Sequence, residues 1–149
     1  MYQHILVPID GSETSKTAIQ HAASIAQACQ SKITLVQVLI LDPLIAAEYL
    51  HMGESNHLIE RARTVMQQDL SKAQQLLLEY GVNAESQILE GHVVHSEILN
   101  AATALQADLI IMGSHGYSGI KKLFLGSVAQ NLISEASIPV LITGQSTPT

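Results

Sequence analysis

Three glycines and a serine in the last third of the chain have the spacing of a phosphate-binding loop. Gly113 and Gly116 follow an apolar run, and nine residues later Gly126 and Ser127 precede a helical pattern. Glycine permits backbone conformations that a Cβ would resist and lets a ligand approach the main chain closely. We expect Ser127 to cap the helix, whose unpaired N–H groups and dipole favour an anion. A phosphate chain is the predicted occupant.

Asp10 is a second residue with chemical potential, because it directly follows the apolar run 5–9. As a structural group, its carboxylate would cap the helix that comes next. As a ligand group, it would accept hydrogen bonds from ribose hydroxyls or help to hold a divalent cation beside the phosphates. The residues by themselves leave both roles open.

Apolar runs and helical spacings alternate along the chain and predict the elements that must position these groups. The expected strands are 5–9, 33–38, 83–89, 109–112 and 140–142. The expected helices are one that Ser12 or Thr14 caps, a short one from Asp42 to Leu50 that Gly53 ends, and the segments 58–80, 94–105 and 128–136. One face of the long helix is expected in the core and carries Leu58, Ala62, Val65, Met66, Leu70, Ala73, Leu76, Leu77 and Tyr80.

Length and composition indicate a single domain over residues 1–144, with a short tail at 145–149. The net charge of −6 argues against nucleic acid as a partner, because neutralising a phosphate backbone needs a basic surface. No run approaches the roughly 18 apolar residues of a membrane span. Cys29 is the only cysteine, so no intramolecular disulfide can form, and the simplest expectation is a cytoplasmic protein that binds no membrane.

The glycine spacing carries a family resemblance. The spacing resembles the nucleotide-binding signature of the ATP-binding branch of the universal stress protein family. In that signature, two residues separate Gly113 from Gly116, and nine residues separate Gly116 from Gly126-Ser127. The segments 5–10 and 109–116 resemble that family in type and position, so the resemblance covers nearly the whole chain. It implies a Rossmann-like protein that binds ATP, with Mg²⁺, and serves as a nucleotide-dependent regulator of the stress response with at most slow ATP hydrolysis.

The resemblance also assigns roles to single residues. It favours the ligand role for Asp10, near ribose or a metal ion, and places backbone groups near Val38 at the adenine edge. Pro8, Ile9 and Met112 would line the adenine slot. His115 would either donate to a phosphate or face solvent, and Lys121 and Lys122 are within reach of a triphosphate or simply solvated. The residues assigned to the phosphates are Gly113, Gly116, Gly126, Ser127 and Val128.

Alternating strands and helices predict an α/β fold, a single doubly wound sheet of five parallel strands with helices on both faces. We expect the order 3-2-1-4-5, because the resemblance implies it and because the least hydrophobic strand, 83–89, then lies on an edge. In that order the crossover direction reverses between strands 1 and 4, and ligands bind at such a point. Asp10 and Gly113 end those two strands, so both lines of reasoning predict the same cleft.

Two other functions share alternating strands and helices. An ATP-cleaving or adenylating enzyme would need a general base and a second substrate pocket, and the motifs of P-loops, dinucleotide folds and serine hydrolases are absent. A phospho-receiver domain would need an acidic cluster after strand 1, an aspartate ending strand 3 and a lysine ending strand 5, where this chain has Asp10 alone, Glu90 and Thr143. The histidine pairs His92/His95 and His51/His57 lack metal-ligand spacing and are expected at the surface or at helix caps.

The last strand predicts a homodimer. Val140, Leu141 and Ile142 are apolar although the expected order puts their strand on an edge. An apolar edge with unpaired backbone groups favours pairing with a second copy, which is also what the resemblance implies.

Overall fold

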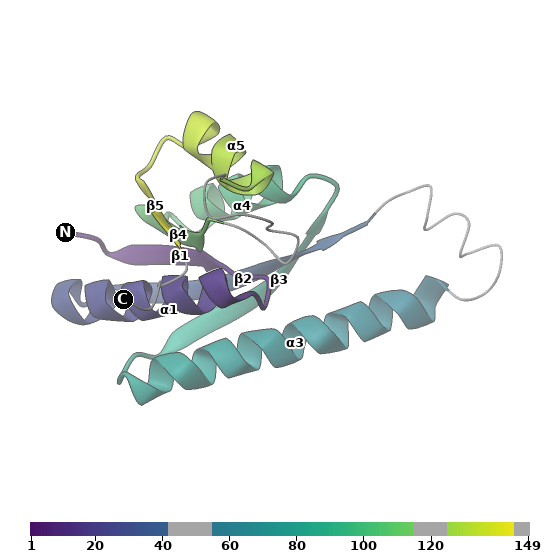
Figure 1. The fold of residues 1–149 in the computed structure, drawn as a ribbon, viewed down its shortest axis with the longest axis horizontal. Coiled ribbons are helices and arrows are strands. Elements are labelled where there is room, and N and C mark those ends of the chain that lie inside the picture. Colours follow the sequence, from purple (N-terminus) through teal and green to yellow (C-terminus); the bar gives the residue numbers. More distant parts are fainter. Residues whose placement is uncertain (42–54, 115–124, 145–149) are drawn as a thin grey trace.

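A parallel sheet forms the centre of the protein (Figure 1). The computed structural model describes residues 1–41, 55–114 and 125–144. The predicted short helix after Asp42, most of the glycine-rich loop and the tail at 145–149 lie outside these ranges. The elements are β1 (His4–Pro8), α1 (Glu13–Cys29), β2 (Lys32–Ile40), α3 (Ser55–Glu79), β3 (Ala84–Gly91), α4 (Val94–Ala104), β4 (Leu109–Gly113), α5 (Ser127–Glu135) and β5 (Val140–Thr143).

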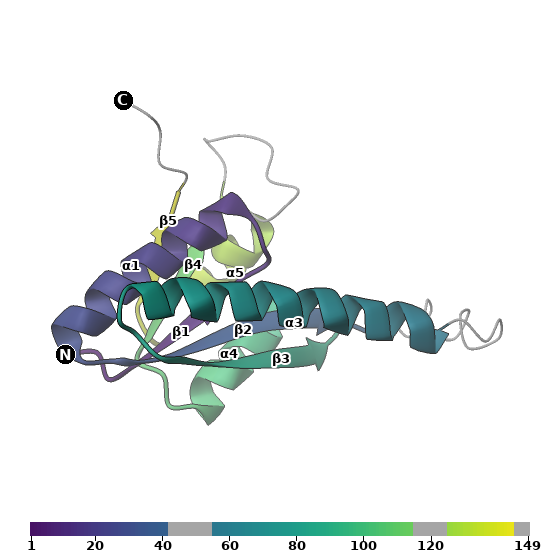
Figure 2. The ribbon, with the colours of Figure 1, turned by 90° about the horizontal axis from the view of Figure 1, so that it is seen from below.

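The strand order is β3-β2-β1-β4-β5, and all four pairings are parallel, as predicted. α1 and α3 cover one face of the sheet, and α4 and α5 cover the other (Figures 1 and 2). The sheet therefore separates two apolar cores. Ile5 and Val7 of β1 face the core under α1 and α3, and Leu6 between them faces the core under α4 and α5.

The residues of β3 confirm that it is an edge strand. Its exposure alternates between partly buried and exposed over most of its length, whereas every residue of β4 is buried. A central parallel strand is covered on both faces and can be apolar throughout, but an edge strand has only one well-covered face. The alternation of polar and apolar residues in β3 therefore matches its position at the edge of the sheet, where β2 is its only neighbouring strand.

The long helix α3 departs from the predicted apolar face. Leu70, Ala73 and Leu77 are buried as expected, but Leu58, Val65 and Tyr80 are exposed at 42%, 55% and 42%. Leu58 and Val65 precede Leu70 by twelve and five positions, which places them roughly 120° and 140° around the helix from it. The prediction that the whole stripe lies in the core was wrong, because the stripe is wider than the face that the sheet covers.

Asp108 joins the amino ends of two central strands. Its carboxylate accepts hydrogen bonds from the backbone N–H groups of Gln3, at 2.9 and 3.1 Å, and His4, at 3.0 Å. Burial alone would raise the pKa of Asp108. The pKa nevertheless lies below its usual value, because the carboxylate accepts backbone hydrogen bonds from Gln3, His4 and its own N–H group and lies near the His4 imidazole. The ionised carboxylate is thus the form that the folded state favours.

The variant Asp108→Asn tests this role through pH. A lowered pKa in the folded state contributes stability above the unfolded-state value of about 3.9, and that contribution is lost as the pH falls through the folded-state value. We expect the variant to be less stable near pH 7 by about 1 kcal/mol or less, since the carboxylate is partly solvated. The difference in unfolding free energy, measured by denaturant titration, should shrink between pH 5 and pH 3. A difference that stays constant over this range would contradict the assignment.

Candidate functional site

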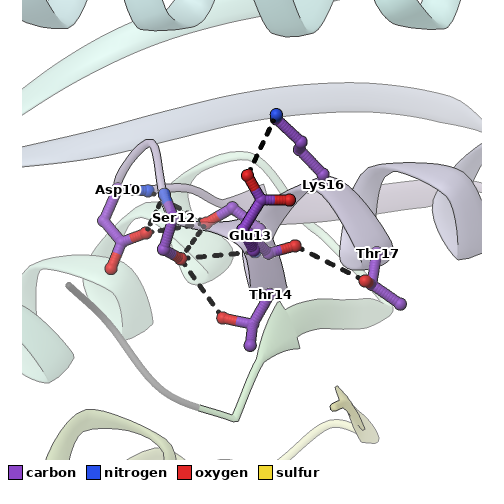
Figure 3. Close-up of polar contacts among 7 residues, drawn as sticks. Asp10, Ser12, Glu13, Thr14, Lys16 and Thr17 are labelled. Atoms are coloured by element: carbon purple, nitrogen blue, oxygen red, sulfur yellow. Dashed lines mark hydrogen bonds and ion pairs between the residues drawn. The ribbon is translucent and has the colours of Figure 1, made fainter. Parts of the chain in front are cut away.

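Asp10 lies in the turn between β1 and α1 (Figure 3). Its Oδ1 accepts hydrogen bonds from the backbone N–H of Ser12, at 2.9 Å, and from the Ser15 hydroxyl, at 2.8 Å. Gly11, between them, has φ of 82°, a left-handed conformation that side chains with a Cβ rarely adopt. The aspartate therefore has a structural role, since it fixes the turn into α1, but the cap predicted as its structural alternative is Ser12.

The other carboxylate oxygen of Asp10 is not used in this turn. Oδ2 has no hydrogen-bond partner among the described residues, and the side chain is half-buried. Thus one oxygen of Asp10 is occupied by the fold, and the other can accept from a ligand hydroxyl or bind a cation. A structural role in the turn and a ligand role are therefore compatible for Asp10.

A chain of hydroxyl groups begins α1. Ser12 is its N-cap, and its Oγ accepts from the Ser15 N–H at 3.4 Å. The same Oγ lies 3.2 Å from both Thr14 Oγ1 and Ser15 Oγ (Figure 3). The first turn of α1 is therefore held by side chains that all stand within five residues of Asp10, and Ser12 rather than Thr14 is the cap.

Gly113, the last residue of β4, packs against this first turn. A Cβ on Gly113 would lie 2.4 Å from Thr14 Oγ1 and 2.8 Å from the Thr14 carbonyl carbon. Gly113 is not among the described glycines with positive φ, which are Gly11 and Gly81. The glycine spacing predicts a backbone conformation or a close ligand approach at Gly113. The structure adds a different reason, which is the close approach of α1 to the end of β4.

The two ends of the glycine-rich loop meet at the carboxyl end of β4. The Ser114 N–H donates to the Thr143 carbonyl at 2.7 Å, and the Gly126 N–H donates to the Ser114 carbonyl at 2.7 Å. Gly113 and Gly126, separated by thirteen positions, thereby come to one place in the fold. His115, Gly116, Lys121 and Lys122 lie outside the described residues.

The amino terminus of α5 begins at this junction. Gly126 is the N-cap and Ser127 is the first helical residue, so the prediction that Ser127 caps the helix was wrong. Gly126 has no side chain that could cap α5, and no side chain in the described part of the chain does so. The first N–H groups of a helix have no partner within it. Ser127 is exposed. The helix end therefore combines unpaired donors with the positive end of the helix dipole, the arrangement that binds anions.

The apolar residues predicted for an adenine slot are distributed over both faces of the sheet. Pro8, Ile9 and Met112 are buried, and Val38 is half-buried. Met112 and Val38 pack with the core under α4 and α5, whereas Ile9 packs with the core under α1 and α3. Val38 and Met112 thus share a face, and the side chain of Ile9 points to the other one.

Two of the histidines weighed as metal ligands have protein partners, whereas His51 lies outside the described residues. His92 Nδ1 is 2.5 Å from the Leu41 carbonyl, and His95 Nε2 is 3.5 Å from Glu135 Oε2, between α4 and α5. Within the described ranges, no group of three side chains that commonly ligate metals comes together. No helix in those same ranges combines the length and apolarity of a membrane span.

Sequence reasoning missed the partners of the predicted site residues. Gly11, Ser15 and Thr143 contact or shape the turn and the loop base, but none was singled out for this role. The signal for Gly11 and Ser15 was the small and polar run that follows Asp10 directly. Thr143 has no comparable signal, because its contacts are with residues far away in the chain.

Comparison with known proteins gives a consistent result. The profile of the universal stress protein family matches residues 1–144. Universal stress protein MJ0531 of Methanocaldococcus jannaschii is 34% identical over 144 residues, which cover 95% of this chain and 82% of that protein. The solved structure of MJ0577, a universal stress protein of the same organism, is 30% identical, has a TM-score of 0.79, and matches over 99% of each chain. A universal stress protein solved in complex with cAMP is 25% identical, has a TM-score of 0.71, and matches over 97% of this chain and 98% of that one.

Proposed function

This chain belongs to the universal stress protein family, and from that premise we propose that it binds an adenine nucleotide at the carboxyl ends of β1 and β4. The observation that carries the proposal is the meeting of the uncapped α5 terminus with the end of β4, through the Gly126–Ser114 hydrogen bond of 2.7 Å. A phosphate group at this helix end would receive backbone N–H donors and a favourable dipole. The relative that was solved with cAMP supports an adenine nucleotide as the ligand class.

The parts of the nucleotide are assigned as follows. Backbone groups near Val38, with Pro8, Ile9 and Met112, bind the adenine, and Ile9 takes part through its main chain because its side chain packs in the core under α1 and α3. Oδ2 of Asp10 accepts from the ribose or binds Mg²⁺, for which a carboxylate oxygen is a suitable ligand. The phosphates bind at Gly113, His115, Gly116, Gly126, Ser127 and Val128.

We infer that ATP with Mg²⁺ is the physiological ligand and that the protein acts as a regulator. In this role ATP shifts the conformation or the partner choice of the protein, and hydrolysis is at most slow. The competing function is an ATP-cleaving or adenylating enzyme of the same architecture. Product release over many turnovers, at rates near the enzyme median of about 10 s⁻¹, would favour that competitor over a regulator.

The first test is calorimetric titration of the purified chain with ATP and Mg²⁺, after mass spectrometry for nucleotide retained through purification. We expect micromolar or tighter binding. The variant Asp10→Asn keeps one oxygen for Ser12 and Ser15 but replaces the charged Oδ2, so affinity should fall by about tenfold, as expected for a hydrogen bond to a charged group. Wild-type protein that carries no nucleotide and binds none would overturn the proposal.

A matched control separates the two roles of Asp10. In Ser12→Ala, the N-cap hydroxyl is lost but Oδ2 of Asp10 is untouched, so stability should fall by about 1 kcal/mol. ATP affinity should stay within about twofold of wild type, since the ligand oxygen remains. Equal losses of affinity in both variants would mean that Asp10 acts only through the turn.

We also propose that the protein is a homodimer in which β5 pairs with its symmetry mate. β5 is an edge strand, and Val140, Leu141 and Ile142 are only partly buried within one chain. Leu141 also packs against the core under α1 and α3, so Leu141→Asp would disturb folding as well as association. The test is therefore light scattering of the wild type. We expect twice the chain mass of 16.0 kDa at micromolar concentration, and a monomer would contradict the proposal.

A further inference from the structure

Thr143, the last residue of β5, lies in the interior beside the proposed nucleotide site. Only 5% of its surface is exposed, and it is one of five buried polar residues among the described ones. Its neighbour across the sheet is Gly113, with which it pairs in register. A buried hydroxyl needs a hydrogen-bond partner, and the partners of Thr143 come from the two elements that border the site.

The hydroxyl joins α1 to β4. Thr143 Oγ1 lies 3.4 Å from the Thr14 carbonyl and 3.3 Å from the Met112 carbonyl. A hydroxyl has one proton, so it donates to the two carbonyls as a shared, three-centre bond. Thr14 is also the residue against which Gly113 packs. The Thr143 hydroxyl therefore links the first turn of α1 to the end of β4.

The backbone of Thr143 reaches the other half of the site. Its carbonyl accepts from Ser114, whose own carbonyl accepts from Gly126, the N-cap of α5, each at 2.7 Å. One residue of the edge strand is thus bonded to α1, to β4 and, through Ser114, to the start of α5. Of these three elements, α1 follows the Asp10 turn, β4 ends at Gly113 and α5 begins at Ser127.

We propose that Thr143 is a positioning residue of the nucleotide site, which holds the α5 terminus at the correct distance from the Asp10 turn. The inference rests on the proposed function. It adds a residue that does not itself contact the ligand and that links the outer strand to the site. A nucleotide that bridges the two elements binds best when their spacing is set in advance, because less ordering is then needed on binding.

The experiment compares Thr143→Val with Thr34→Val. Thr34 is also a buried strand threonine, at 1% exposure, but its hydroxyl lies 2.7 Å from His4 Nε2, away from the carboxyl ends of the strands. Both variants lose a buried hydroxyl and should lose stability to a similar extent. We expect Thr143→Val to weaken ATP binding by roughly three- to tenfold, the range for loss of one hydrogen bond, and Thr34→Val to leave it unchanged.

A second readout needs no nucleotide. Amide hydrogen exchange at Ser114 and Gly126 should be faster in Thr143→Val than in Thr34→Val, because the bonds of the loop base would open more often. If Thr143→Val does not fold, Thr143→Ser and Thr143→Cys test the hydroxyl instead. Both side chains are smaller than threonine, but only serine keeps a strong hydrogen-bond donor. The serine variant should then bind ATP more tightly than the cysteine variant.

The outcomes distinguish this inference from the proposed function. Wild-type binding with equal affinity in Thr143→Val and Thr34→Val would overturn the positioning role alone. An absence of nucleotide binding by the wild type would overturn both the site and the role of Thr143 in it. Selective loss of affinity in Thr143→Val, with faster exchange at the loop base, would establish the role.

Discussion

In the variant Ser127→Asp, nucleotide affinity is expected to fall by about a hundredfold or more while the protein stays folded. The new carboxylate would stand at the exposed first position of α5, where the proposed phosphates bind. Like charges held together cost several kcal/mol, and each 1.4 kcal/mol is a factor of about ten in affinity. The substitution should also stabilise the folded protein by about 0.3–1 kcal/mol, because an acidic side chain in the first turn interacts favourably with the helix dipole.

The opposite signs of the two effects make the experiment informative. Calorimetry should show the loss of ATP binding, and thermal unfolding should show a melting temperature equal to or above that of wild type. Ser134→Asp is the matched control, because it adds the same charge to an exposed position near the other end of α5. If Ser127→Asp binds ATP as well as Ser134→Asp does, phosphate does not bind at this helix end.

The variant Gly113→Val is expected to lower the free energy of unfolding by about 1–3 kcal/mol, the usual cost of overpacking. The added Cβ would meet the Thr14 side chain at 2.4 Å and its backbone carbon at 2.8 Å, and a backbone atom cannot turn aside as a side chain can. α1 would have to move away from β4. The loss would be seen in denaturant titration as a lower midpoint.

The control for this substitution is Gly144→Val. A Cβ on Gly144 meets nothing within 4 Å, so stability should change by no more than about 0.5 kcal/mol. Equal midpoints in the two variants would show that α1 does not pack closely on Gly113. The result also affects the choice of binding variants. Loss of ATP binding in Gly113→Val could come from the altered packing of α1 as well as from the site itself. Ser127→Asp and Asp10→Asn change the site without introducing this clash.

The sequence by itself determined the fold class, and the strand order followed from the family resemblance together with the polar edge strand. Continuous apolar runs predicted the central strands β1 and β4, and polar alternation predicted the edge strand β3. These signals are local, because burial on one or both faces of a sheet directly sets which residues a strand can carry. The placement of Asp10 and Gly113 at one edge of the sheet followed from the same order, since the carboxyl ends of adjacent parallel strands share one edge.

The tertiary structure decided how each of these residues is used. The packing of α1 on β4 gives a reason for glycine at residue 113 that the sequence does not contain. Likewise, only the turn shows that one oxygen of Asp10 is committed to the fold. The helix that follows the loop begins at Ser127, with Gly126 at the N-cap position. This differs by one residue from the prediction, and propensity cannot resolve such a difference. Thr143 meets Thr14 across 129 positions of sequence. Such a contact leaves no periodic or spacing signal in the chain, because it depends on how separate elements pack together rather than on the residues beside it.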